Sequence, residues 1–600
     1  MSQRTKTRLL LGGILLVTAA VYLRAVGYEP LTAWDDGLYL VNRETVRRWW
    51  SVSWYRRLAT PKTGYPTPVP TFVYAQVRLL APEAYPHLLH GLQIGLHLVA
   101  VGLVFVLARR WLEGDRPALI VAALWALHPV AVESVVWLSN LKTVLAAVGL
   151  LGAMALWERR LDDVQRGTAL SVGIFALWAI AVGSRSETAL LPVLLFAQSV
   201  RRLGWRRAAE VSWRTCAPMV AVAAVVVLLA TTGHGAVMDR AAAADRGLAA
   251  RTVRIFRAVE LSIRHLLLPV GLQPGYFPAP SAGWVAALPG AAGVVSFSLL
   301  LVAAVRSGWT TAAFGMTLTI VLYAPYSNLM FLPRWTADTY LYLPAVGASV
   351  SIVAIARRVI PARDAGGTSV GRRAVWIAAV GLIAGTFALL THRRVGRWRD
   401  ELNLWAPVLR EQPRAGRPYR IVAWALVERD RWRRAADVLD RGLPIFRANR
   451  SYPYFYPEVL TAVDRPRDAC RLAFEAAARV HPRRPAHDKV LLETAAEQEC
   501  GLPTEPDGRE LLRRAVDTYR ARPEWMSRRD QRMSIADYLT KRRLFEPSLP
   551  FVRRELETAE PHCFTWIAAD RMPERVRSTL DLPPRPARCR GGTRGGGDPE

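Results

Sequence analysis

The sequence is poor in cysteine. Five cysteines occur in 600 residues, and no two of them have the spacing of zinc ligands. Cys216 lies in an apolar run, where it acts as a small hydrophobic side chain. An even number in one domain indicates disulfides if that domain faces an oxidising compartment. We therefore predict at least one disulfide, of open connectivity, among Cys470, Cys500, Cys563 and Cys589.

Acidic residues are also scarce relative to basic ones. The chain has 49 Asp and Glu against 79 Lys and Arg, and its net charge is +30. Such a charge is typical of nucleic-acid-binding proteins, but no nucleic-acid motif accompanies it. Much of the basic charge lies in short connectors between hydrophobic runs, where it orients a membrane protein. We expect no nucleic-acid partner.

Apolar and charged residues are segregated along the chain. Apolar residues make up 52% of the sequence although 21% of residues are charged. Up to residue 391, apolar runs alternate with Arg-rich connectors, and most runs have the roughly 20 residues of a membrane-spanning helix. The sequence predicts an all-α, polytopic membrane helix bundle in contact with membrane lipids. Its predicted transmembrane helices, about eleven in number, are 9–24, 88–108, 118–136, 143–157, 168–184, 188–200, 215–232, 284–305, 310–328, 340–357 and 374–391.

The Arg-rich connectors predict the orientation in the membrane. With eleven spans, the basic start of the chain and connectors such as 109–116 and 201–214 all lie on one side, the cytoplasm. The first run is long for a signal peptide and lacks a small-residue cleavage site, so we expect an uncleaved helix. The segment Arg251–Leu268 alternates basic and apolar residues, which is typical of an amphipathic helix in the membrane interface. The N-terminus is then cytoplasmic and the C-terminal part is extracytoplasmic.

The character of the sequence changes after the last run. We predict a transmembrane domain over 1–392, a soluble α-helical domain over 393–583 and a disordered tail over 584–600. The segment Tyr419–Leu443 has the length of a degenerate tetratricopeptide helix–turn–helix unit, which Pro444 would close. The soluble domain is predicted to be helical at 417–443, 466–480, 487–499, 508–521 and 528–543.

Two adjacent carboxylates, Asp35 and Asp36, follow the first predicted helix. Asp-Gly is a common turn pair, so a solvated loop is one interpretation. The other is chemical: a carboxylate at the membrane surface can accept a proton from a hydroxyl group or bind a divalent cation. Both interpretations stay open on the local sequence alone, and no metal-ligand cluster is predicted.

Four further segments carry polar residues at predicted membrane boundaries. Residues 127–137 read Leu-His-Pro-Val-Ala-Val-Glu-Ser-Val-Val-Trp, and residues 340–344 read Tyr-Leu-Tyr-Leu-Pro. Together with the Asp pair, residues 90–97 and residues 184–192, this order resembles the membrane O-mannosyltransferase-like proteins that carry tetratricopeptide repeats, and their bacterial relatives. The resemblance runs over roughly residues 30–420, and 127–137 is its most specific part.

The resemblance implies a C-type glycosyltransferase fold in a bacterial cytoplasmic (inner) membrane. It implies sugar transfer from a polyprenyl-phosphate donor to a protein or glycan acceptor on the extracytoplasmic side. Asp35 and Asp36 are the candidate catalytic bases, because the acceptor hydroxyl needs a base and the phosphate needs cations. The histidines could equally be core residues, and the tyrosine an interface aromatic. The candidate substrate-binding residues are His90, His128, Glu133, Lys142, Arg185, Glu187, Arg264, Asp338 and Tyr340.

The chain departs from the pattern of these relatives at specific positions. The relatives read Glu-Arg-Lys-Asp at 140–143 and an Arg at 339, whereas this chain has Asn140, Leu141, Thr143 and Thr339. Two cationic and two acidic side chains are thereby missing. A changed donor, a changed acceptor or a loss of activity would each produce this pattern. The alternative function is a non-catalytic membrane scaffold that presents the helical domain to periplasmic partners.

Overall fold

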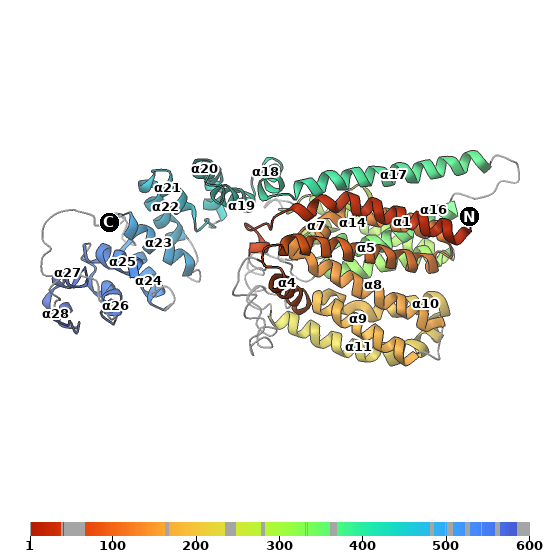
Figure 1. Cartoon of the computed structure of the whole chain (residues 1–600), viewed down its shortest axis with the longest axis horizontal. Helices are drawn as coiled ribbons and strands as arrows, with labels where there is room; N and C mark the ends of the chain where they lie inside the picture. Colours follow the sequence, from red (N-terminus) through yellow and green to blue (C-terminus); the bar gives the residue numbers. More distant parts are fainter. Residues whose placement is uncertain are drawn as a thin grey trace. The chain divides into compact units, whose positions relative to one another are not determined.

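The structure is a computed structural model of the whole chain, and every described element is a helix (Figure 1). The chain divides into two compact units, Met1–Gln412 and Pro413–Glu600. The division falls later than the predicted boundary at 392, because α18 (Glu401–Glu411) packs with the first unit. The described residues are 2–37, 40, 67–162, 167–233, 248–277, 283–329, 332, 334–359, 369–449, 451–479, 485–498, 500, 508–521, 529–541, 543–557 and 564–584.

The first unit is a helix bundle built from long apolar helices joined by short 3-10 turns. Six helices of its described part are long and apolar enough to cross a membrane. The helices 115–126 and 129–136, which meet at a bend of 50°, make a seventh if the pair is a single span. The chain is thus consistent with a membrane protein. The main helices are α1 (Gln3–Tyr22), α4 (Pro68–Leu80), α5 (Tyr85–Trp111), α6 (Asp115–Ala126), α7 (Val132–Val136), α8 (Leu141–Asp162), α9 (Gly167–Ser184), α10 (Leu191–Leu203), α11 (Trp205–Gly233), α13 (Leu248–Leu267), α14 (Leu288–Arg306), α15 (Thr310–Tyr323), α16 (Pro344–Val359) and α17 (Ser369–Arg397).

The count of eleven spans stays a prediction. The runs 188–200, 310–328 and 340–357 fall on α10, α15 and α16, which have 13, 14 and 16 residues. Each of these helices has a 3-10 turn beside one end and a proline close to that end. The short turns are η1 (Leu23–Gly27), η4 (Pro129–Ala131), η5 (Leu138–Asn140), η6 (Ser186–Leu190), η7 (Trp284–Ala287), η8 (Ala324–Tyr326) and η9 (Asp338–Leu341).

Small residues allow two helices of the bundle to approach closely. A Cβ atom added to Gly315 of α15 would lie 2.5 Å from the Ser351 hydroxyl and 2.8 Å from the Gly347 carbonyl of α16. Apolar side chains gain little by leaving lipid for the bundle interior, so membrane helices rely on this close backbone packing. The α15–α16 pair is therefore closely packed through its small residues.

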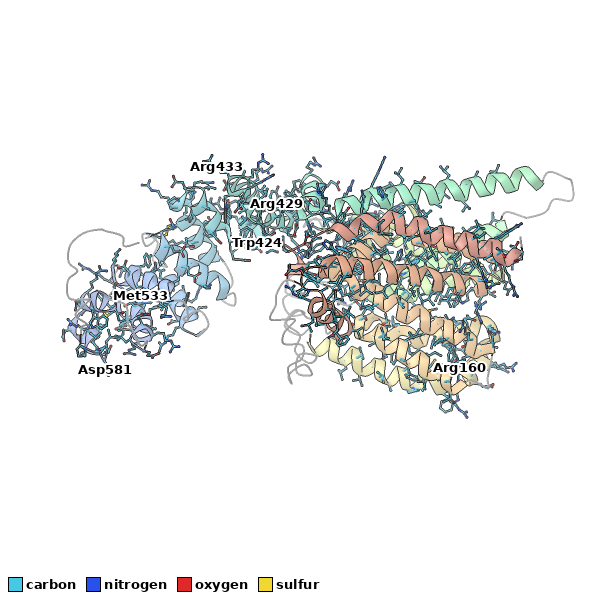
Figure 2. The ribbon with its side chains drawn as sticks, in the orientation of Figure 1. Arg160, Trp424, Arg429, Arg433, Met533 and Asp581 are labelled. Atoms are coloured by element: carbon cyan, nitrogen blue, oxygen red, sulfur yellow. A yellow bond between two sulfur atoms is a disulfide. The ribbon has the colours of Figure 1, made fainter. Side chains whose placement is uncertain are left out.

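The second unit is a series of helical hairpins. Consecutive helices pack in pairs, α19 with α20, α21 with α22, α23 with α24 and α25 with α26. Figure 2 labels Trp424 on α19 and Arg433 on α20, the two helices of the first pair. The predicted helix–turn–helix at 419–443 is confirmed as a hairpin. The helices are α19 (Gly416–Val427), α20 (Trp432–Asn449), α21 (Tyr456–Ala462), α22 (Pro466–Arg479), α23 (Pro485–Glu497), α24 (Gly508–Arg520), α25 (Arg529–Lys541), α26 (Phe545–Leu556), α27 (Phe564–Asp570) and α28 (Glu574–Arg577).

Two local predictions for this unit have clear outcomes. Pro444 does not close the first hairpin, because α20 continues through it to Asn449. A proline inside a helix removes one hydrogen bond, and here the buried ring of Phe446 packs edge-on against Tyr419 and holds the last turn. The predicted disulfide is confirmed between Cys470 and Cys500. Cys563, Cys589 and nearly all of the predicted tail lie outside the described residues.

Candidate functional site

Polar side chains gather at one end of the first unit, where four 3-10 turns meet. The turns η5 and η9 lead into α8 and α16, η6 leads into α10, and η8 follows α15. The loop before α4, which carries the Asp pair, joins them. Figure 1 shows α4 and α7 at this end of the bundle and the N-terminus of α1 at the other. We call this group of turns the polar end.

Asp36 is a structural anchor of the polar end. Its carboxylate is buried and accepts hydrogen bonds from the Leu31 N–H at 3.0 Å, the Ser139 N–H at 2.9 Å and the Ser139 hydroxyl. Burial raises the pKa of Asp36 to about 6, in opposition to these donors, which favour the carboxylate. Through the two donors of Ser139, Asp36 connects the first loop to η5.

Asp35 is less buried than its neighbour and lies near two cations. It is half-buried, and its charge lies within electrostatic range of Lys142 and Arg334. Lys142, in the first turn of α8, is half-buried and also lies within range of Arg185 and Glu187. Of the two adjacent carboxylates, Asp35 is the one placed to meet another molecule.

Arg334 and Glu133 form an ion pair at the centre of the polar end. The Arg334 Nη1 donates to Glu133 Oε1 at 2.6 Å, and its Nη2 donates to the Pro274 carbonyl at 2.6 Å. The guanidinium also lies 5.3 Å from the ring centroid of Trp34 and 5.7 Å from that of Trp137. Glu133 is fully buried, and its second oxygen has no hydrogen-bond partner among the described residues.

A second ion pair lies on η6. Arg185 Nη2 is 3.2 Å from Glu187 Oε1, and its Nη1 donates to the Thr143 hydroxyl at 2.7 Å. Its guanidinium also lies over the Tyr326 ring at 5.2 Å. Burial works against the charge on Glu187, but Arg185 outweighs it and holds the pKa of Glu187 below its usual range. The three cations of the polar end therefore have three carboxylates, including Asp35, close to them.

Three positions noted in the sequence, Asn140, Thr143 and Thr339, belong to one hydrogen-bonded chain. The Thr143 hydroxyl donates to Asn140 Oδ1 at 3.0 Å and lies 3.3 Å from the Thr339 hydroxyl. Thr339 in turn lies 3.0 Å from the Ser134 hydroxyl. All four side chains are buried. The neutral donors and acceptors of these four buried side chains satisfy one another.

Asp338 connects three segments of the first unit, and its role as a substrate-binding residue stays a prediction. It is fully buried, pairs with Arg394 of α17 and accepts from the Tyr276 hydroxyl at 2.6 Å. Arg394 Nη1 also donates to the Pro129 carbonyl at 2.8 Å. His265 Nδ1 lies 3.6 Å from the same carboxylate. The sequence did not single out Arg394 or His265, because each sits among other basic residues.

The histidines are buried in the bundle. The ring of His128 accepts from the Val130 N–H and its Nε2 lies 3.1 Å from the Leu266 carbonyl, so it joins the bend between α6 and α7 to α13. His97 lies between the Ala126 carbonyl and the Tyr342 hydroxyl. His90 is buried against the edge of the Tyr28 ring. These contacts are those of core side chains.

The last two candidate residues, Arg264 and Tyr340, differ in their exposure to solvent or lipid. Arg264 is exposed on α13, and none of the ion pairs within the described residues includes it. The fold buries its neighbour His265, since successive residues of a helix face different sides. Tyr340 is buried, stacks on Tyr326 with ring centroids 4.5 Å apart and donates to the Arg334 carbonyl at 3.1 Å. Tyr340 therefore supports the backbone of Arg334.

The helix α18 supplies residues that the sequence did not reveal as part of the polar end. Glu401 is buried and accepts from the Ala33 N–H at 3.2 Å. Trp34 packs between Trp137, at a centroid distance of 4.0 Å, and Trp405, at 5.1 Å. These contacts hold the loop that carries Asp35. The only signal in the sequence was the Trp398-Arg399-Asp400 motif just before α18.

No group of three or more His, Cys, Asp or Glu side chains in the described part of the chain is arranged to hold a metal ion. The arrangement suits an anion and a hydroxyl group. Comparison of the chain with protein-family models, with curated proteins and with solved structures gives no match. The motifs at the polar end are therefore the basis for any functional assignment.

Proposed function

We propose that this chain is a membrane glycosyltransferase that moves a sugar from a polyprenyl-phosphate donor to a protein or glycan acceptor on the extracytoplasmic side. The observation that supports it best is the position of Asp35. This half-buried carboxylate lies within electrostatic range of Lys142 and Arg334 at one end of the helix bundle. A base and cations beside one another at a membrane boundary are what transfer from a lipid phosphate requires.

In the proposed reaction, an acceptor hydroxyl oxygen attacks the anomeric carbon of the sugar. The bond between that carbon and the phosphate oxygen breaks, and its electron pair leaves with the polyprenyl phosphate. Asp35 accepts the hydroxyl proton, and Lys142 stabilises the charge that develops on the phosphate. Asp36 stays in its hydrogen bonds with Leu31 and Ser139 and positions Asp35.

The second candidate function is a non-catalytic scaffold, and one observation favours it. Arg185 and Arg334 each already bond to a carboxylate, Glu187 and Glu133. Phosphate must then compete with the carboxylate that each of these two arginines already binds. Lys142 is the cation that separates the candidates, because the scaffold needs no phosphate contact from it.

We also propose that the second unit is a tetratricopeptide-like array that binds the acceptor. The ends of α19, α21 and α23 share a turn in which an N–H donates to the carbonyl five residues earlier. The donors are Arg431, Arg465 and Cys500. Their spacing is about 34 residues, the length of one tetratricopeptide repeat. The Cys470–Cys500 disulfide supports an oxidising, extracytoplasmic location for this unit.

Direct binding of a polyprenyl phosphate tests this function. The purified chain is titrated with polyprenyl monophosphate by native mass spectrometry. Removal of a charge-assisted phosphate contact costs about tenfold in affinity, so Lys142→Gln should bind about that much more weakly. Lys6→Gln is the matched control, since Lys6 is an exposed lysine near the start of α1, at the other end of the first unit (Figure 1). Equal binding by both variants and the wild type, or no binding at all, would favour the scaffold.

A further inference from the structure

A cavity of about 340 Å³ lies at the end of the first unit away from the polar end. It is bounded by the end of α5, the start of α15 and the end of α16, and Trp111, Trp309, Thr310 and Arg357 are among its lining residues. The polar end lies near Tyr85 at the opposite end of α5. That helix has 27 residues, or roughly 40 Å at 1.5 Å per residue, which is a full bilayer thickness.

The lining of this cavity is cationic. Arg357 and Arg358 are both exposed at its wall, and one carboxylate, Glu113, faces them. Arg357 also donates to the Leu112 carbonyl, which fixes one edge of its guanidinium and fastens α16 to α5. Two guanidinium groups beside a single carboxylate leave a net positive charge, so the cavity favours an anion.

The start of α15 adds hydrogen-bond donors to the same wall. The first intrahelical bond of α15 runs from the Ala313 N–H to the Trp309 carbonyl, so the N–H groups of Thr310, Thr311 and Ala312 have no acceptor within the helix. The first turn of α15 contains no acidic residue. The partial positive charge of this helix end therefore adds to that of the two arginines.

The surroundings of the cavity are apolar and open to lipid. Exposed apolar side chains lie on the two helices that flank α15: Val305 on α14, and Ile352 and Val359 on α16. Trp309 is half-buried at the wall, and tryptophan prefers the headgroup level of a membrane. The acyl chains of a lipid can pack against these apolar side chains, whereas a free anion gains nothing from them.

We propose that this cavity binds the phosphate headgroup of an anionic membrane lipid, with Arg357 and Arg358 as its ligands. The basic connectors predict that this end faces the cytoplasm, where anionic lipids attract arginine at about 1 kcal/mol for each side chain. The inference concerns a site separate from the polar end. It holds whether or not the chain transfers sugars.

Native mass spectrometry of the full-length protein, delipidated and titrated with lipid, tests this site. Phosphatidylglycerol and phosphatidylcholine of identical acyl chains compare an anionic with a zwitterionic headgroup. The wild type should bind one phosphatidylglycerol at least about fivefold more tightly than phosphatidylcholine, and R357Q/R358Q should lose that preference. The matched control is R206Q/R207Q, which removes the same charge from two exposed arginines at the start of α11, outside the cavity, and should keep it.

Arg357 also donates to the Leu112 carbonyl, so its replacement could weaken the packing of α16 on α5. A second variant, which keeps Arg357, separates this effect from the loss of a lipid contact. Arg358→Gln alone should weaken phosphatidylglycerol binding about fivefold. Equal binding of both lipids by the wild type, or an unchanged preference in R357Q/R358Q and Arg358→Gln, would overturn the proposal. A competition with inorganic phosphate completes the experiment. If it displaces phosphatidylglycerol at equal concentration, the ligand is a soluble phosphate and the lipid assignment fails.

Discussion

Replacement of Arg334 by methionine should destabilise the first unit by about 3–5 kcal/mol, the usual cost of breaking a buried ion pair from one side. The estimate follows from Glu133, which is fully buried and whose only ion-pair partner among the described residues is Arg334, at 2.6 Å. Without the guanidinium, the carboxylate keeps its charge in an apolar surrounding or must take up a proton. The methionine side chain fills a similar volume, so lost packing contributes little.

A double-mutant cycle isolates this effect. Glu133→Gln removes the stranded charge, so E133Q/R334M should be less destabilised than Arg334→Met alone. About 2 kcal/mol should remain, because the contacts of Arg334 with Trp34, Trp137 and the Pro274 carbonyl are still lost.

The assay is the apparent free energy of unfolding in mixed micelles, followed by tryptophan fluorescence. Arg264→Met applies the same exchange to an exposed arginine and should change stability by less than about 0.5 kcal/mol. Strictly additive effects of Arg334→Met and Glu133→Gln would show that the two side chains are not coupled, and the assignment of a buried ion pair would fail.

Further predictions concern the Asp pair and the disulfide. Asp35→Asn should leave stability within about 0.5 kcal/mol, whereas Asp36→Ala should cost about 3 kcal/mol by stranding buried donors, as measured by the same unfolding assay. Because burial raises the pKa of Asp36 from 3.8 to about 6, its contribution to stability is greatest below about pH 4 and falls by about 3 kcal/mol as the pH rises through 6. Between pH 4.5 and 7 the decline in the free energy of unfolding should be about 2 kcal/mol in the wild type and absent in Asp36→Asn. Reduction of the Cys470–Cys500 disulfide, whose sequence separation is 30, should destabilise the second unit by about 3.5 kcal/mol; an unchanged thermal melt under reductant would contradict this.

The sequence predicted the helical class and the apolar helices, because segregation of apolar residues into long runs is a local property of the chain. It also predicted that Glu133, Lys142, Arg185 and Glu187 lie at one membrane boundary. The fold gathers these four residues at the polar end, and the position of the membrane stays a prediction. The 3-10 turns were not predicted, since they depend on how each helix end packs. The pairing of the later helices into hairpins was also not predicted, because the small residues at which they pack lie in strongly charged sequence.

The different roles of Asp35 and Asp36 could not be read from the sequence. The two residues are adjacent and chemically identical, and only the fold brings Ser139, 103 positions away, to one of them. The partners of Asp338 were hidden in the same way, because Arg394 and Tyr276 lie 56 and 62 positions away in the sequence. The role of each carboxylate therefore depends on hydrogen bonds and ion pairs with residues that are distant in the sequence.

The rate of sugar transfer by Asp35→Asn tests the central claim most directly. The purified wild type and the variant are each supplied with a panel of polyprenyl-phosphate-linked sugars and a mixture of protein and glycan acceptors, and transfer of labelled sugar is measured. Loss of a general base reduces such a rate by about 100-fold or more. The account predicts transfer by the wild type and a loss of that size in a variant of unchanged stability. Transfer by Asp35→Asn at the wild-type rate would contradict it.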